Sequence, residues 1–383
     1  MRTRTTGTRR AAVMAAGLGL TMALAACGQN AAAPAPAPSG GGGASAAPAA
    51  GGAKIGVILP ETKSSARWEG FDKPLLTAAM QAEGLQADIQ NAQGDVQKFS
   101  TLADGMISSG VKVLVIAAID SESGAAVAAK AKAQGIPTID YDRLSLGGTS
   151  DYYVSFDNVK VGELQGQGLA DALKGKQGAE IIEIAGAPTD NNATLFYDGA
   201  QTALKSGYDS GAFKRVEKQA IPDWDNQVGG TTFEQILTKN GNKVDGVLAA
   251  NDGLAGAVIT VLTKYGLNGK VPVTGQDATP DGLQAILRGD QYMTVYKPIK
   301  QEAEAAAKLA GALAKGDTAT ADGLATGKVN DPKGNRDVKS VLLTPQSITK
   351  DNVKTVIDEG QVKASEVCVS AVSDACKQAG IAA

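Results

Sequence analysis

An arginine and a tryptophan, Arg67 and Trp68, stand side by side at the end of a polar loop that follows an apolar run, residues 55–59. Open α/β sheets place ligand-binding groups in this way, because their ligands bind outside the carboxyl ends of the strands. The guanidinium offers a planar fork of donors and the indole offers a flat apolar face. The pair suits a ring with hydroxyls on its edge and C–H groups on its faces, as a sugar has. The alternative interpretation is a surface arginine beside a core tryptophan.

Polar side chains follow later apolar runs in the same way, and they include Asp142, Arg143, Asn191, Asn192, Asn251 and Asp277. Carboxylates accept hydrogen bonds from hydroxyls, whereas arginine and asparagine donate to them, so these residues fit the same ligand chemistry. Two other interpretations stay open. Asp142 and Arg143 could form a structural ion pair, and Asp142 and Asp277 could serve a carboxylate-based glycoside hydrolase if they face each other.

Strands and helices alternate from Lys54 onward, in the order expected of a parallel sheet with crossover helices. The order then recurs: KVLVIAAIDS at 112–121 is echoed by KVDGVLAAND at 243–252, and GIPTIDYDR at 135–143 by GKVPVTGQDA at 269–278. An internal repeat of this length predicts two similar Rossmann-like α/β lobes. Because both lobes carry their polar residues at strand ends, the two sets can face each other across a cleft.

Composition excludes several classes of function. The chain has 383 residues, which is long for a single core, and a net charge of −3 with no basic stripe, which makes it a poor nucleic-acid binder. It contains no histidine, so Ser-His-Asp catalysis, Cys-His catalysis and histidine-ligated metal sites are excluded. We expect neither a metal ion nor a cofactor.

The N-terminal segment has the features of an export signal. Residues 1–10 carry four arginines, residues 11–26 are apolar but too short for a comfortable membrane span, and Cys27 follows two alanines. This pattern resembles a bacterial lipobox, so we expect residues 1–26 to be a lipoprotein signal peptide and Cys27 to be lipidated. Residues 27–53, rich in Ala, Pro, Gly and Ser, would form a flexible tether. The protein would be exported and anchored to the outer face of the cell membrane, or periplasmic.

The two remaining cysteines, Cys368 and Cys376, lie close together near the C-terminus. An oxidising compartment outside the cytoplasm would allow them to close a short disulfide loop, and two free buried thiols are the alternative. On the chain-entropy model such a loop stabilises the fold by about 2–3 kcal/mol.

The chain also resembles a known family over residues 54 to about 360. The matching words, in family order, are PETKSSARW (60–68), YDR (141–143), SFDNVKVGELQ (155–165), PTDNNATLFYDG (188–199), NDGLAG (251–256), GQDA (275–278), MTVYKP (293–298) and LLTP (342–345). They resemble the periplasmic sugar-binding proteins of bacterial ABC importers, in particular the xylose-binding and multiple-monosaccharide-binding proteins.

This resemblance implies a type I periplasmic-binding-protein fold, in which two lobes are joined by a hinge of three chain crossings. The first lobe would comprise residues 54–157 plus about 278–340, and the second lobe residues 158–277 plus about 341–383. The two lobes would close around a ligand by a hinge motion.

The resemblance also assigns a substrate-binding site, whose members would be Arg67, Trp68, Asp142, Arg143, Asn192, Trp224, Asn251, Asp277 and Lys297. The two tryptophans would lie against opposite faces of the sugar ring, and the charged and amide side chains would bond its hydroxyls. Three points stay open. Asn191 rather than Asn192 could point inward, Lys297 could be a hinge residue, and Lys63 is a weaker additional donor.

The family implies binding without chemistry, so the chain is not expected to be an enzyme. As a monomeric lipoprotein it would capture a monosaccharide, D-xylose first and glucose or a related aldose next, and deliver it to an ABC permease and its ATPase. It could alternatively present the sugar to a chemoreceptor or a sensor kinase. A sugar-responsive transcription factor of the same fold would need an N-terminal DNA-binding unit, which residues 1–53 do not provide.

Overall fold

The computed structural model describes residues 52–63 and 65–382. The expected signal peptide, Cys27 and most of the expected tether therefore lie outside the described residues. Within the described part of the chain, no helix is long and apolar enough to cross a membrane.

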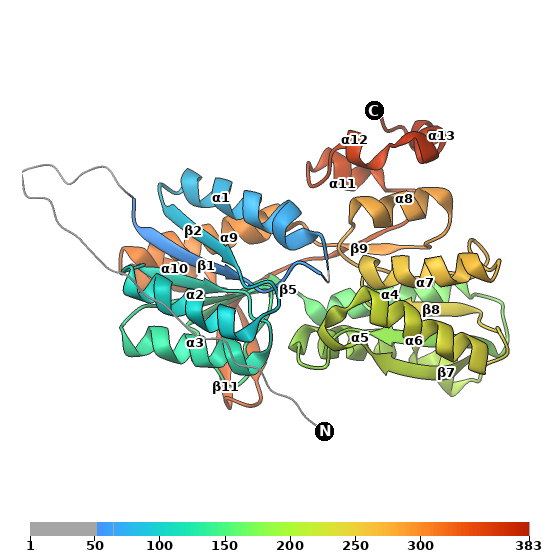
Figure 1. The fold of residues 1–383 in the computed structure, drawn as a ribbon, viewed down its shortest axis with the longest axis horizontal. Helices are drawn as coiled ribbons and strands as arrows, with labels where there is room; N and C mark the ends of the chain where they lie inside the picture. Colours follow the sequence, from blue (N-terminus) through green and yellow to red (C-terminus); the bar gives the residue numbers. More distant parts are fainter. Residues whose placement is uncertain (1–51, 64, 383) are drawn as a thin grey trace, which may run out of the picture. The chain divides into compact units, whose positions relative to one another are not determined.

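A seven-stranded sheet forms the centre of the first lobe, with the strand order β10-β11-β5-β4-β3-β1-β2 (Figure 1). Neighbouring strands are parallel except β10 and β11, which are antiparallel. The strands are β1 (Lys54–Leu59), β2 (Gln86–Asn91), β3 (Val113–Ile116), β4 (Thr138–Tyr141), β5 (Tyr152–Phe156), β10 (Gly327–Asp331) and β11 (Arg336–Leu343). The helices are the short π-helix η1 (Trp68–Asp72), α1 (Lys73–Ala82), α2 (Val96–Ser108), α3 (Ser121–Ala133), α9 (Ile299–Ala314) and α10 (Thr318–Leu324).

Helices cover both faces of this sheet, with α1 and α9 on one side and α2 and α3 on the other (Figure 1). Side chains along each central strand alternate between the two cores. Val57 and Val115 pack in the core that contains residues of α1 and α9, whereas Ile58 and Ile116 pack in the core that contains residues of α2 and α3. Burial on both faces is the reason that these strands read as continuous apolar runs.

The second lobe is built around a three-stranded parallel sheet in the order β7-β6-β8, which a bridge from Val247 to Val273 continues beyond β8. Its strands are β6 (Ala179–Ala185), β7 (Phe213–Ala220) and β8 (Gly246–Ala249), and its helices include α4 (Asn158–Ala172), α5 (Asn191–Asp209), η2 (Pro222–Trp224), α6 (Asn226–Lys239) and α7 (Asp252–Lys264). Ile181 packs with residues of α4 and α5, and Ile182 with residues of α6 and α7. The prediction of two α/β lobes is therefore confirmed.

Two elements that follow the second sheet pack with it rather than with the first lobe. They are α8 (Pro280–Arg288), which contacts α7, and β9 (Thr294–Tyr296), which contacts α4 and pairs antiparallel with β12 (Gln346–Ile348). We therefore propose that the first lobe resumes at α9, so that the chain crosses between the lobes at Lys297 and Pro298. The sequence had led us to expect this crossing near residue 278. We propose that the other two crossings lie between β5 and α4 and between β11 and β12, which follow each other directly in the chain.

The C-terminal segment forms a small apolar cluster with α8. It consists of α11 (Lys354–Asp358), α12 (Ala364–Val367), η3 (Ser370–Val372) and α13 (Ser373–Gln378). Cys368 and Cys376 are joined by a disulfide, and Cys376 is buried in the same cluster as Val356 and Ile286. Phe71 of the first lobe also belongs to this cluster, so the segment contacts both lobes.

Side-chain caps define where the helices near the cleft begin. Asp190 accepts a hydrogen bond from the backbone of Asn192 at the start of α5, and Asn251 accepts one from Leu254 at the start of α7. An N-cap acceptor satisfies backbone donors that the first turn leaves unpaired. The helix starts that follow strand ends are thus set by the polar residues that the sequence places there.

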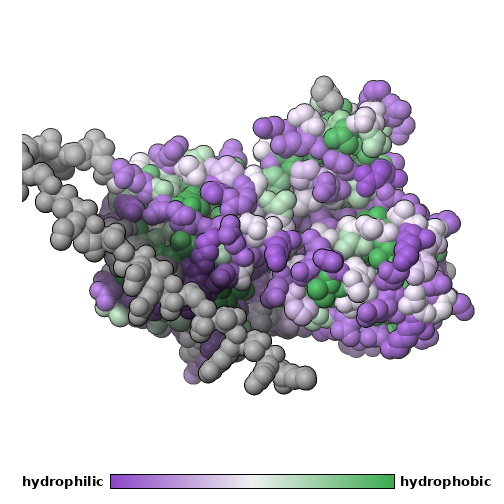
Figure 2. Space-filling model, viewed as in Figure 1, coloured by the Kyte–Doolittle hydropathy of each residue, from purple (hydrophilic) through white to green (hydrophobic). Residues whose placement is uncertain are grey.

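Figure 2 shows one face of the molecule, on which hydrophilic residues cover most of the described surface and hydrophobic side chains are scattered among them. The large exposed hydrophobic residues of the described part include Val96 in α2, Val228 in α6 and Tyr292 in the loop before β9. Scattered exposure of this kind is ordinary for a protein surface.

Candidate binding site

A polar pocket lies between the two lobes and encloses about 300 Å³ of space, which includes solvent at its opening. All nine residues that the sequence assigned to a substrate site line it: Arg67, Trp68, Asp142, Arg143, Asn192, Trp224, Asn251, Asp277 and Lys297. Four further residues line it that the sequence interpretation did not include, namely Ser65, Asp190, Phe196 and Gln276. Asn192 and not Asn191 faces this pocket, and Lys63 lines a neighbouring cavity instead.

Strand ends bring these side chains together. Arg67 and Trp68 follow the loop after β1, Asp142 directly follows β4, and Asn251 follows β8. Parallel strands present their carboxyl ends at one edge of a sheet, so residues far apart in the sequence meet there. Lys297 comes from the crossing after β9.

Three pocket residues adopt backbone conformations with positive φ, at 61° for Asp142, 54° for Trp224 and 96° for Asp277. Such values are uncommon for residues other than glycine and persist only where the surrounding structure holds them. Trp224 also needs a glycine beside it, because a Cβ on Gly186 would lie 2.1 Å from a ring carbon of its indole. The pocket walls are therefore built on tightly constrained backbone.

The guanidinium of Arg67 is buried and bonded to three carboxylates. Its Nε and one Nη donate to the two oxygens of Asp72 at 2.8 and 2.7 Å, and the same Nη donates to Glu302 at 3.0 Å. The other Nη donates to Asp142 at 2.6 Å. Burial alone would lower the pKa of Arg67, but Asp142, Asp72 and Glu302 raise it well above its ordinary value. Arg67 is thus permanently charged, and most of its donors are already used.

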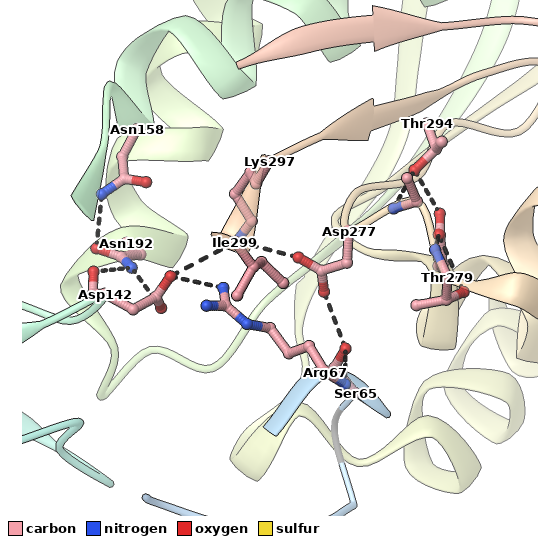
Figure 3. Close-up of polar contacts among 12 residues, drawn as sticks. Ser65, Arg67, Asp142, Asn158, Asn192, Asp277, Thr279, Thr294, Lys297 and Ile299 are labelled. Atoms are coloured by element: carbon pink, nitrogen blue, oxygen red, sulfur yellow. Dashed lines mark hydrogen bonds and ion pairs between the residues drawn. The ribbon is translucent and has the colours of Figure 1, made fainter. Parts of the chain in front are cut away.

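A chain of ion pairs links the two lobes through Lys297 (Figure 3). Its Nζ lies 3.0 Å from Asp277 Oδ1 and 3.7 Å from Asp142 Oδ2. Asp277 in turn accepts a hydrogen bond of 3.1 Å from the Ser65 hydroxyl of the first lobe. Burial would raise the pKa of Asp142, but Arg67, Lys297 and Arg143 hold it at about 2. Asp142 is therefore a carboxylate at neutral pH, which removes it as the general acid of a glycoside hydrolase.

A second link between the lobes runs through Asp190, which the sequence interpretation missed. Its Oδ2 lies 3.1 Å from Arg143 Nε and accepts a hydrogen bond of 3.1 Å from the indole of Trp224. Burial raises the pKa of Asp190, although Arg143 opposes the shift. Its position as a helix N-cap in the word PTDNN was the only signal for it in the sequence.

The first tryptophan is held by polar partners on several sides. The Trp68 indole donates to Glu61 Oε1 at 2.7 Å. The guanidinium carbons of Arg67 and Arg143 lie 4.5 and 5.2 Å from its ring centre, within the range of cation–π attraction. Trp224 contacts Phe196 edge to face, with 6.5 Å between the ring centres. Both indoles are thus fixed in place before any ligand arrives.

Within residues 52–63 and 65–382, no group of three or more acidic, cysteine or histidine side chains is placed to hold a metal ion. What the pocket offers is a dense set of hydrogen-bond donors and acceptors around two indoles. Such a set can hold a small polyhydroxylated molecule, with each hydroxyl able both to donate and to accept.

The fold and the pocket together define a class of protein, a two-lobed α/β binding protein that encloses a small polar molecule between its lobes. The chain belongs to the periplasmic binding protein family, because the profile of the periplasmic binding protein domain matches residues 55–318. The resemblance found in the sequence is thereby confirmed.

Individual relatives agree with this assignment. The D-xylose-binding periplasmic protein of Escherichia coli (strain K12) is 38% identical over 315 residues, which cover 82% of this chain and 92% of that protein. The multiple sugar-binding periplasmic receptor of Rhizobium radiobacter is 36% identical over 332 residues, which cover 82% of this chain and 91% of that one.

A solved structure also matches. An ABC transporter solute-binding protein from Clostridium phytofermentans with bound β-D-glucose superposes with a TM-score of 0.75 at 31% identity. The match covers 82% of this chain and 99% of that one. Because it spans nearly the whole of the solved protein, the similarity extends to both lobes.

Proposed function

We propose that the chain is an extracytoplasmic receptor that captures a monosaccharide in the interlobe pocket and delivers it to an ABC permease and its ATPase. D-xylose is the first candidate and glucose or a related aldose the next. The observation that carries the proposal is the convergence of nine expected residues, drawn from both lobes, on one polar pocket.

The roles of the side chains follow from their chemistry. Asp142 and Asp277 would accept hydrogen bonds from sugar hydroxyls, and Arg143, Asn192 and Lys297 would donate to them. Asn251 would take a further hydroxyl, and Trp68 and Trp224 would face the C–H surfaces of the ring. A pocket of this kind discriminates against an analogue that lacks one hydroxyl, because its own polar groups would then be buried unpaired.

The names of similar proteins support the ligand class. A D-xylose-binding protein, a multiple sugar-binding receptor and glucose-bound solute-binding proteins from Clostridium phytofermentans and Chloroflexus aurantiacus all match most of this chain. The ligands named for these proteins differ, so xylose and glucose are separated only by experiment.

Isothermal titration calorimetry of the mature protein against a panel of aldoses tests the proposal. We expect one site with a dissociation constant in the micromolar range or tighter for at least one of D-xylose and D-glucose, and weaker binding of deoxy analogues. Both tryptophans of the chain line the pocket, so their fluorescence should also change on binding. The absence of heat and of any fluorescence change with every aldose would refute the proposed ligand class.

We also propose that Cys27 is lipidated and that residues 27–53 tether the receptor to the cell membrane. The sequence pattern before Cys27 supports this. Expression of the full-length chain with a labelled fatty acid should label the wild type and not a Cys27→Ser variant. Equal labelling of both would refute anchoring at this residue.

A further inference from the structure

Two buried acids lie behind Arg67 and outside the set of residues that line the pocket, and the sequence interpretation included neither. We infer that Asp72 and Glu302 are positioning residues for ligand binding: they hold the guanidinium of Arg67 so that its remaining N–H, beside Asp142, faces the pocket. This role rests on the proposed function, and it explains what orients the guanidinium of Arg67.

The hydrogen bonds of Arg67 show which of its edges is fixed. An arginine has five N–H donors. Asp72 takes one from Nε and one from an Nη, and Glu302 takes the second from that Nη. The other Nη gives one N–H to Asp142, which leaves one donor, and Arg67 itself lines the pocket. The edge held by Asp72 and Glu302 is therefore the edge that points away from a ligand.

Neither acid is placed to contact a ligand. Asp72 and Glu302 are both fully buried, and the pocket lining includes neither of them. The Tyr141 hydroxyl donates to Asp72 at 2.8 Å, which fixes that carboxylate in turn. An effect of these acids on binding would have to pass through Arg67.

Glu302 also connects this cluster to the chain crossing. It lies in the first turns of α9, which begins directly after Lys297 and Pro298, while Arg67 lies after β1. Lys297 carries the interlobe ion pairs with Asp142 and Asp277. Arg67 and Lys297 therefore share Asp142 from two sides, and Glu302 fixes Arg67 relative to the helix that starts at the crossing.

Burial is the main influence on the pKa of Glu302, and the charges around it act in both directions. The titratable and charged groups that face this cluster are Arg67, Asp72, Tyr141, Asp142, Tyr153 and Lys297. Burial and then Asp142 raise the pKa of Glu302 well above its ordinary value, against the opposing effect of Arg67. Glu302 accepts from Arg67 through Oε2, and the oxygen of a glutamine amide can take the same position.

Three variants of the mature protein and one control separate positioning from general stability. Glu302→Gln keeps an acceptor for Arg67, Glu302→Met keeps the length of the side chain without an acceptor, and Asp72→Asn loses one of its two acceptor oxygens. Asp331→Asn is the matched control, because Asp331 is also a fully buried acid of the first lobe beside an arginine, but that arginine, Arg336, does not line the pocket. The measurements are Kd by calorimetry with D-xylose and D-glucose, and Tm without sugar.

We expect Glu302→Met and Asp72→Asn to weaken binding roughly 10- to 100-fold, the effect of losing one hydrogen bond to a charged group. Glu302→Gln should bind within about threefold of the wild type at pH 7, and Asp331→Asn should leave Kd unchanged whatever it does to Tm. If Glu302→Met and Asp72→Asn lower Tm but bind as the wild type does, the acids are structural only and the inference is wrong.

A crystal structure of Glu302→Met without sugar gives a readout that needs no ligand. The inference expects the guanidinium of Arg67 to rotate or to lose its contact with Asp142, whereas an unmoved guanidinium would overturn it. If the wild type binds no aldose, the proposed function fails, and this structure still decides whether Glu302 orients Arg67.

Discussion

Removing the positive charge of Lys297 should both loosen the fold and weaken ligand binding. The Lys297 side chain is 3% exposed. Its Nζ lies 3.0 Å from a carboxylate oxygen of Asp277 and 3.7 Å from one of Asp142. At an effective dielectric constant of about 20, two unit charges 3.0 Å apart attract each other by about 5 kcal/mol. Desolvation of both groups offsets much of this attraction. The net contribution of the ion pair to stability is therefore smaller than the free energy lost when only one of its partners is removed.

Lys297→Met leaves Asp277 buried with only the Ser65 hydroxyl as a side-chain partner among the contacts of the described residues. Breaking a buried ion pair in this way costs about 3–5 kcal/mol, because a charge stays buried without compensation. Urea unfolding of the sugar-free protein at pH 7 should show a loss of that size in the free energy of unfolding. Calorimetry should show binding weakened by at least about tenfold, as expected for a lost charged hydrogen bond.

The double variant Lys297→Met with Asp277→Asn separates the two effects. It removes both charges, so it should be more stable than the sum of the single losses predicts, with a coupling of about 1–3 kcal/mol. Ligand binding should not recover, because Asp277 itself would bond a hydroxyl. Additive losses in the double variant, or a Lys297→Met protein as stable as the wild type, would refute the ion-pair account.

Three further predictions concern Arg67, the disulfide and a buried aspartate. Arg67→Ala should abolish measurable heat of binding and also lower the free energy of unfolding by about 3–5 kcal/mol in urea, because it leaves buried carboxylates unpaired; an unchanged stability would show that the carboxylates find other partners. Replacing Cys368 and Cys376 by serine should lower the free energy of unfolding by about 2–3 kcal/mol, from the loop they close, while Kd stays the same; a changed Kd would show that the C-terminal segment acts on the pocket. Burial raises the pKa of Asp140 to about 6 from an ordinary value of 3.8, so the folded state binds more protons than the unfolded state between about pH 4 and pH 6, and stability falls as pH rises through that window. Asp140→Asn should remove this part of the pH dependence in thermal unfolding, and an unchanged profile would exclude Asp140 as its source.

Several residues that line the pocket could be identified from the sequence because the fold encodes their positions locally. Asp142, Asn251 and Asp277 each follow an apolar run within a few residues, and the repeated strand pattern predicts that such ends converge. In a parallel sheet the local sequence of a strand shows which residues follow its carboxyl end. These residues can therefore be predicted without knowledge of distant contacts. The pattern accounts for residues at the strand ends, whereas Trp224 and Lys297 were expected only from the family resemblance; all nine line one pocket.

The location that we propose for the second crossing depended on packing instead. The segment containing α8 and β9 is a helix followed by a strand, and it would show the same sequence pattern in either lobe. Its sequence therefore does not reveal which lobe it packs against. In the structure β9 pairs with β12, which follows it by some fifty residues, and α8 packs beside α7. Long-range pairing of this kind leaves no local periodicity to read.

What the sequence by itself determined is therefore the layered α/β order, the repeat, and the side chains at the strand ends. What only the tertiary structure decided is which buried charges become partners. Arg67 is shared by Asp72, Asp142 and Glu302, the last of which lies 235 positions away. Arg143 and Trp224 similarly meet on Asp190. A charged side chain must find its counter-ion once it is buried, and the choice among distant candidates is made by geometry that exists only after the lobes have folded.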